Sequence, residues 1–206
     1  MKRPTLVMTE ALPAAPRQAR STDKRRKLLD AARALFREKG YDATSIQDIT
    51  SQAGTAAGAF YIYFRSKQQL LVVLMNELME RLGALELRPQ SGDDMQSALR
   101  DFVAEIFRTD LEHYGVIRAW HEASLTDPEL RAMREKIESW SEARILEVFR
   151  RLQTFPNARP DRDLHAFARM MDRHFWALLA RAATLTQREL NRETRIAADV
   201  IFHYLF

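Results

Sequence analysis

The sequence has no cysteine and no apolar run approaching the ~20 residues that span a bilayer. Without thiols, the chain has no disulfides, thiolate metal sites or cysteine nucleophiles, which fits a reducing cytoplasm. Residues 1–20 also lack the unbroken apolar core of a signal peptide. Internal repeats, low-complexity tracts and the alternating pattern of β-strands are missing as well. These absences favour an all-α protein of one or two domains with a cytoplasmic localisation.

Motifs of the common enzyme classes are missing too. The sequence contains no phosphate-binding glycine-rich loop, no H-E-x-x-H and no Glu-x-x-His pair of the di-iron type. His121 is followed by Glu122 but has no second histidine, and His165 and His174 are too far apart for simple chelation on one helix face. We therefore expect no catalytic residues, no metal site and no cofactor.

Positive charge is concentrated near the beginning of the chain. The formal net charge is +4, but residues 1–67 contain 13 basic and 6 acidic residues, and the remainder is net negative. A basic run alone usually marks a solvated surface. A basic segment that coincides with a nucleic-acid-binding motif instead indicates a surface that faces DNA.

Such a motif lies between residues 44 and 67. Thr44 and Gln47 fit a capping box at the start of a short helix, and Gly54 fits the left-handed residue that ends it. A second short helix follows, with Phe60 and Phe64 on its buried side. Two short helices joined by a glycine-containing turn are typical of a helix-turn-helix, whose second helix lies in the DNA major groove.

A larger set of residues gives this region a specific resemblance. The ordered set is Phe36, Gly40-Tyr41, Ile46, Ile49, Ala53-Gly54, Gly58, Phe60 to Phe64, Ser66-Lys67 and Leu70-Leu71. It resembles the TetR family of bacterial transcriptional regulators over about the first third of the chain. Prolines and scattered basic residues predict a flexible basic arm over 1–20. The resemblance implies a three-helix DNA-binding domain over 21–66 and a helical ligand-binding and dimerisation domain over 67–206.

The resemblance also implies which residues contact DNA. Ala57, Gly58 and Ala59 would face the bases, Tyr61 and Lys67 would contact phosphate, and Thr44 and Ser45 would hold phosphate from the preceding helix. The full set of expected DNA contacts is Thr44, Ser45, Gln47, Thr55, Ala57, Gly58, Ala59, Tyr61, Tyr63 and Lys67.

The recognition helix departs from the family in having few polar side chains. Family members often carry serine at the position of Ala56 and a polar or basic residue at that of Ala57. Since Arg or Lys is missing here, direct guanine readout by this helix is excluded. We expect specificity from thymine-methyl contacts of Ala57 or Ala59, from Thr44, Ser45 and Gln47, and from DNA shape. Arg17 or Arg20 of the arm could add contacts in a minor groove.

The rest of the chain continues with helical spacing. The last two helices carry more apolar side chains than one helix face can bury, which favours a homodimer through these helices, as the resemblance also implies. The resemblance further implies a small-molecule inducer with an apolar part. Its expected wall residues are Phe107, Trp120, His121, Trp140, Met170 and His174, although each also fits an ordinary core.

The sequence thus predicts a DNA-binding regulator, more readily a repressor than an activator, that binds a near-palindromic operator and is released by its inducer. Two alternatives stay open. The first is a DNA-binding regulator without a small-molecule ligand, and the second is a helical-bundle enzyme with an accessory DNA-binding motif.

Overall fold

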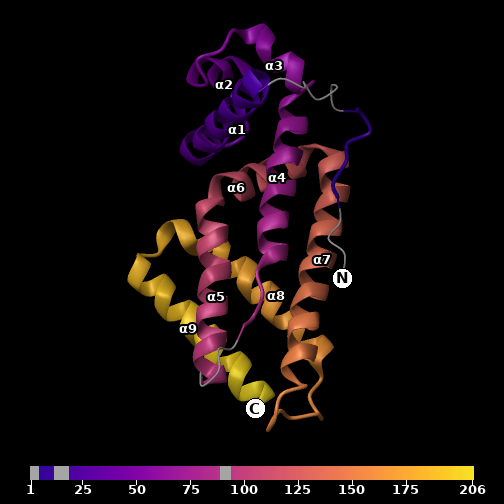
Figure 1. Cartoon of the computed structure of the whole chain (residues 1–206), viewed down its shortest axis with the longest axis vertical. Helices are drawn as coiled ribbons and strands as arrows, with labels where there is room; N and C mark the ends of the chain where they lie inside the picture. The colour runs from indigo at the N-terminus through magenta and orange to yellow at the C-terminus, as the bar shows by residue number, and fades with distance from the viewer. Residues whose placement is uncertain (1–4, 12–18, 89–93) are drawn as a thin grey trace. The chain divides into compact units, whose positions relative to one another are not determined.

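The computed structural model describes residues 5–11, 19–88 and 94–206, and in these ranges the chain is helical without any strand. This confirms the all-α prediction. The helices, labelled in Figure 1, are α1 (Ala19–Lys39), α2 (Ile46–Gln52), α3 (Ala57–Tyr63), α4 (Lys67–Ala84), α5 (Met95–Glu112), α6 (Tyr114–Thr126), α7 (Pro128–Leu152), α8 (Leu164–Arg181), the 3-10 turn η1 (Ala182–Thr184) and α9 (Gln187–Leu205). None of the helices described is both long and apolar enough to cross a membrane.

The helices gather into two compact units. The first unit contains the described residues up to Glu80 together with His113–Glu135, and the second contains Arg81–Glu112 and Lys136–Phe206. The domain boundary expected after residue 66 remains a prediction. The first compact unit extends beyond that boundary, because it also contains α4 up to Glu80, all of α6 and α7 up to Glu135.

The first unit is built on the apolar stripe of α1. Leu28, Ala32 and Phe36 are fully buried in it, and α1 packs against both α2 and α6. Phe60 and Phe64 from the helix-turn-helix are also completely buried, as predicted, and their rings lie 5.6 Å apart. Burial of apolar surface of this kind is the main force that stabilises short helices such as α2 and α3.

Two glycines set the turns of this unit. Gly40 follows α1 with φ of 83°, and Gly54 follows the C-cap of α2 with φ of 63°. Side-chain-bearing residues rarely adopt this left-handed conformation, whereas glycine does so without steric cost. The predicted role of Gly54 at the end of α2 is confirmed.

The beginning of the chain differs from the predicted flexible arm. Residues 5–11 lie against α4, where Leu6 is buried and bonded through its backbone to the Asn76 side chain. Helix α1 begins at Ala19, so Arg20 belongs to its first turn. Arg17 lies outside the described residues, as do residues 1–4.

The second unit has an aromatic and aliphatic core from α5, α7, α8 and α9. The ring of Phe167 stacks between Phe149, at 5.1 Å, and Tyr204, at 4.0 Å. The last turn of α9 is held by arginines from the loop between α7 and α8: Arg162 Nε donates to the carbonyl of Tyr204 and Arg159 Nε to that of Phe206. Cations at a helix C-terminus bond its free carbonyls and oppose its negative dipole end.

Candidate nucleic-acid interface

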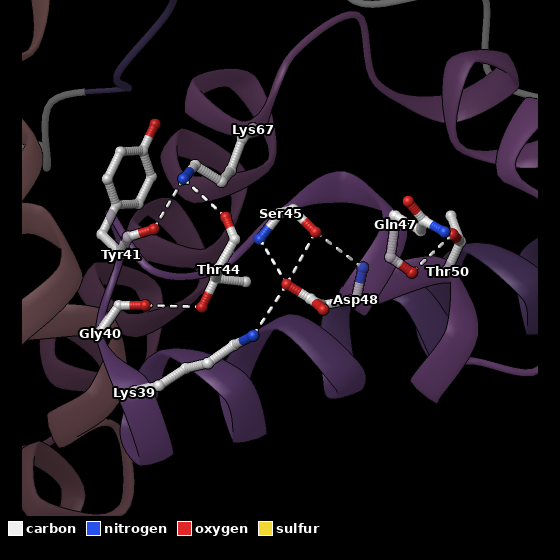
Figure 2. Close-up of polar contacts among 9 residues, drawn as sticks. All are labelled: Lys39, Gly40, Tyr41, Thr44, Ser45, Gln47, Asp48, Thr50 and Lys67. Carbon is white, nitrogen blue, oxygen red and sulfur yellow. Dashed lines mark hydrogen bonds and ion pairs between the residues drawn. The ribbon is translucent and has the colours of Figure 1, made fainter.

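Helix α2 begins one residue later than predicted. Ser45 is its N-cap, since Ser45 Oγ accepts from Asp48 N at 3.1 Å and Asp48 Oδ2 accepts from Ser45 N at 2.8 Å (Figure 2). This reciprocal pair is a capping box. The predicted capping pair of Thr44 with Gln47 is therefore wrong, because the same pattern occurs one residue further along the chain.

A lysine joins the end of α1 to this cap. Lys39 Nζ lies 2.8 Å from Asp48 Oδ2. Hydrogen bonds from Lys39 and Ser45 hold the pKa of Asp48 well below its ordinary value. The carboxylate thus stays charged near neutral pH and fixes the direction in which α2 leaves the turn.

Thr44 holds the turn from inside. Its side chain is buried, and its hydroxyl donates to the carbonyl of Gly40 at 2.6 Å (Figure 2). A hydroxyl used in this way is turned away from solvent, so Thr44 positions the start of α2 rather than presenting a donor to phosphate. Ser45 and Gln47, in contrast, are exposed on α2.

Lys67, at the start of α4, is bound to the same turn. Its ammonium donates to the carbonyls of Tyr41 at 2.6 Å and Thr44 at 2.7 Å, and it lies 4.0 Å from the Tyr41 ring centroid (Figure 2). Partial burial is the main reason that the pKa of Lys67 is lowered. Two protein acceptors hold this charge, so Lys67 fixes the turn to α4 and has one donor hydrogen left for another partner.

Helix α3 presents a smooth outer face. Ala57 and Gly58 are exposed, and a Cβ built on Gly58 would meet no atom within 4 Å. Tyr61 and Ile62 project beside them, with 57% and 56% of their surface exposed. Thr55 and Ala59 are partly exposed at the edges of this face. The backbone of α3 is therefore accessible to a close neighbour along its first turn.

Tyr63 does not share this face. It is buried, and its ring lies 6.5 Å from that of Phe64. Helical spacing explains the difference, because Tyr63 falls on the same side as the buried Phe60 whereas Tyr61 falls away from it. Its predicted role in DNA contact thus has no exposed surface to support it.

Several basic side chains near the start of α1 make only weak, exposed contacts within the protein. Arg26 and Lys27 pair with Asp23 at 2.8 and 3.1 Å, in pairs that are largely exposed. Arg25 lies over the Phe64 ring, 5.5 Å from its centroid. Exposed ion pairs contribute little to stability, so phosphate oxygens can compete for these cations.

Helix α6 supplies a contact that sequence reasoning missed. Glu122 Oε2 accepts from the backbone N–H of Tyr41 at 2.6 Å, and Arg118 Nε donates to its other oxygen at 2.8 Å. Near the other end of α6, a Cβ on Gly115 would lie 2.6 Å from the backbone nitrogen of Arg37. The turn that precedes α2 is thus held by both α4 and α6.

The residues expected to form a ligand pocket are dispersed. Phe107 and Trp140 are buried in the second unit, where Phe107 meets Phe175 edge to face at 5.5 Å. Trp120 is buried in the first unit, and its indole N–H has no hydrogen-bond partner among the described residues. His121, Met170 and His174 are exposed and so do not form the wall of an enclosed site.

Two carboxyl groups in the second unit were also not foreseen. Burial raises the pKa of Asp110 on α5 to about 7, although the residue keeps some exposed surface. Burial also raises the pKa of Asp172 on α8. A hydrogen bond that Ser141 Oγ donates to Asp172 Oδ1 at 2.6 Å acts in the opposite direction and lowers the pKa, but burial has the larger effect. Acidic side chains on core-facing helix surfaces carry no periodic signal that would reveal them in the sequence.

Comparisons with known proteins agree with this geometry. Residues 28–74 match the family described as bacterial regulatory proteins of the tetR family. A relative in Bacillus subtilis (strain 168), the uncharacterized HTH-type transcriptional regulator YuxN, is 34% identical over 96 residues, which are 46% of this chain and 33% of YuxN. The match therefore spans well under two thirds of that relative.

Solved structures share the fold at low sequence identity. A TetR-family regulator from Mesorhizobium loti superimposes with a TM-score of 0.69 at 22% identity, covering 91% of this chain and 99% of the other. SmeT in complex with triclosan gives a TM-score of 0.68 at 22% identity, covering 88% and 91%. The likeness establishes the nine-helix type of fold for the part of the chain that the structure describes.

Proposed function

Because the chain belongs to the TetR family of bacterial regulatory proteins, we propose that it is a transcriptional regulator that binds operator DNA as a homodimer. The proposed place of action is the cytoplasm. The observation that carries the proposal is the exposed outer face of α3, which is free of bulky side chains at Ala57 and Gly58 and sits in a basic segment.

This face fits the major groove by close approach. Methyl groups of Ala57 and Ala59 suit contact with thymine methyls, and Tyr61 can reach the backbone from the same helix. Ser45, Gln47 and Thr55 flank this helix with polar groups of their own. Thr44, Lys67 and the buried Tyr63 act mainly by holding α2, α3 and α4 in position.

Dimerisation is supported by apolar side chains on the outside of the second unit. Ile196 and Val200 on α9 have 46% and 44% of their surface exposed, and Met170 on α8 has 51%. Ile196 and Val200 are one helical turn apart, so they form one stripe. A second copy of the chain, related by a two-fold axis, could cover this stripe and Met170. Such a dimer would present two α3 helices to one face of the DNA.

The proposed regulation is release from DNA by a small molecule with an apolar part. A protein of the same fold, SmeT, is known in complex with triclosan, and another of its structures names it as the repressor of a multidrug efflux pump. In the second unit of this chain, Phe107 and Trp140 supply buried apolar surface for such a molecule. Ligand binding would favour a dimer whose α3 helices are wrongly spaced for the operator.

Selection from a pool of random duplexes tests the proposal and needs no operator sequence at the outset. The purified protein is incubated with the pool at near-physiological salt, and bound duplexes are amplified and sequenced over several rounds. We expect a near-palindrome whose half-sites lie about one DNA turn apart. Enrichment of an asymmetric site, or of none, would contradict binding by a two-fold dimer.

A further inference from the structure

Residues 5–11 lie against α4 as a non-helical segment that makes several specific contacts. Leu6 N donates to Asn76 Oδ1 at 3.0 Å, and Asn76 Nδ2 donates back to the carbonyl of Leu6 at 2.9 Å. The Leu6 side chain is only 3% exposed, whereas that of the next residue, Val7, is 70% exposed. Leu6 is thus buried against α4, whereas its neighbour Val7 points to solvent.

The same segment continues toward the helix-turn-helix. The carbonyl of Glu10 accepts from Gln69 Nε2 at 2.9 Å, and Gln69 is itself buried in the first turn of α4. Gln69 Oε1 also accepts from the backbone N–H of Arg65 at 2.9 Å. One amide side chain therefore joins the segment to the turn through which the chain leaves α3.

A third contact joins the segment to α7. Both the hydroxyl and the backbone N–H of Thr9 donate to Glu129 Oε1, the hydroxyl at 2.9 Å. Glu129 belongs to the first turn of α7. In Figure 1 the segment runs beside the start of that helix. Residues 5–11 consequently connect α4, the α3–α4 turn and the start of α7, all within the first unit.

We propose that residues 5–11 form a positioning strap that fixes the first half of α4 and the exit of α3, so that undocking of the strap weakens operator binding. The recognition helix has only two turns and no side-chain cap at its start, so its direction depends on the structures at its ends. The strap holds the end at which α3 meets α4. Its docking is independent of the proposed function, and its effect on operator binding rests on that function.

Substitutions at two neighbouring residues separate the effect of releasing the strap from the effect of an added negative charge. Leu6→Asp places a carboxylate in the buried anchor site and should release the strap, whereas Val7→Asp adds the same charge at an exposed position. Any general repulsion from DNA is therefore equal in the two variants. Leu6→Met, which keeps an apolar side chain of similar volume, should retain the docked state.

Hydrogen exchange in the full chain without DNA tests the docking. In wild type and in Val7→Asp, we expect the backbone amides of residues 6–10 to exchange at least about tenfold more slowly than in Leu6→Asp. Release of the strap in Leu6→Asp would expose these amides to solvent. Residues 67–80 of α4 should also exchange faster in Leu6→Asp. Equal exchange of both segments in the two Asp variants would overturn the strap, whether or not the protein binds DNA.

Operator affinity tests the positioning. If release of the strap leaves about a tenth of the molecules competent, Leu6→Asp binds the selected duplex about tenfold more weakly than Val7→Asp, and Leu6→Met matches wild type. The measurement is made well below the thermal midpoints of all variants, so that a loss of stability alone would not change the affinity. Equal operator affinities, together with released exchange in Leu6→Asp, would overturn the positioning role.

Discussion

At the scale of single residues, Gly58 is a position where the packing of the protein does not explain the presence of glycine. Nothing in the described protein lies within 4 Å of where its Cβ would be, so packing does not require glycine there. Glycine also destabilises a helix interior by about 0.5–1 kcal/mol relative to alanine. A residue that costs stability without a packing reason is expected where another molecule approaches the backbone closely.

Gly58→Ala should therefore raise the free energy of unfolding by up to about 1 kcal/mol and weaken operator binding. Urea unfolding and titration of the selected duplex measure the two effects. Binding to scrambled DNA at low salt is the control and should change little, because it depends on phosphate contacts. An unchanged operator affinity would remove the α3 backbone from the interface.

Asp110 makes a residue-scale prediction about pH. Its pKa is raised to about 7 in the folded protein, against a model-peptide value near 4 in the unfolded chain. Between these values the folded state binds more protons, so the contribution of Asp110 to stability falls as the pH rises from 4 to 7. Asp110→Asn should remove this fall and stabilise the protein more at pH 8 than at pH 5.

Asp101, an exposed residue of the same helix, supplies the control for that measurement. Asp101→Asn should change the free energy of unfolding by a similar small amount at both pH values. If Asp110→Asn behaves in the same way as the control, then Asp110 is ionised and solvated in the folded protein.

At the scale of helices, the close contact of α6 with α1 depends on Gly115. A methyl group at this position would meet the backbone of Arg37 at 2.6 to 2.8 Å, and backbone atoms cannot yield as a flexible side chain can. Gly115→Ala should lower the free energy of unfolding by about 1–3 kcal/mol, as overpacking does. Thermal or urea unfolding measures the loss.

Gly83→Ala is the matched substitution in another helix. Its Cβ would lie 3.6 Å from Trp140, an ordinary van der Waals contact, so we expect a neutral or slightly stabilising effect. Similar losses in both variants would show that the α1–α6 contact is less tight than the structure indicates.

Helix positions followed well from the sequence because apolar spacing determines which face is buried. Leu28, Ala32, Phe60 and Phe64 all lie in the core as expected. The start of α2 was misplaced by one residue because Thr44 and Ser45 both suit a cap. The choice is decided by the hydrogen bond from Thr44 to Gly40, which no local pattern reveals.

Contacts between segments far apart in the sequence could not be predicted from local sequence patterns. Leu6 is the one buried residue among the described residues 5–11, and a lone apolar residue has no periodic partner that would reveal its burial. Glu122 reaches the turn at Tyr41 from 81 residues away. The two hydrogen bonds from Lys67 to the carbonyls of Tyr41 and Thr44 likewise join residues far apart in the sequence, and no local pattern predicts them.

At the scale of the whole molecule, the proposed dimer predicts that substitutions at two exposed apolar residues affect dimerisation differently. Val200→Arg places a charge in the proposed interface on α9 and should shift the protein from dimer to monomer. Leu125→Arg, at a residue of α6 that is 68% exposed, should leave the dimer intact. Sedimentation velocity at micromolar concentration distinguishes the species. A dimeric Val200→Arg variant would place the interface elsewhere.

We propose that this chain recognises a specific DNA sequence through the outer face of α3. The most direct test of this proposal is a titration of the wild-type protein onto the selected duplex and onto a scrambled duplex at near-physiological salt. We predict binding to the selected duplex that is on the order of a thousandfold tighter. Equal, salt-sensitive binding to both duplexes would contradict the claim and leave only the attraction of a basic surface for phosphate.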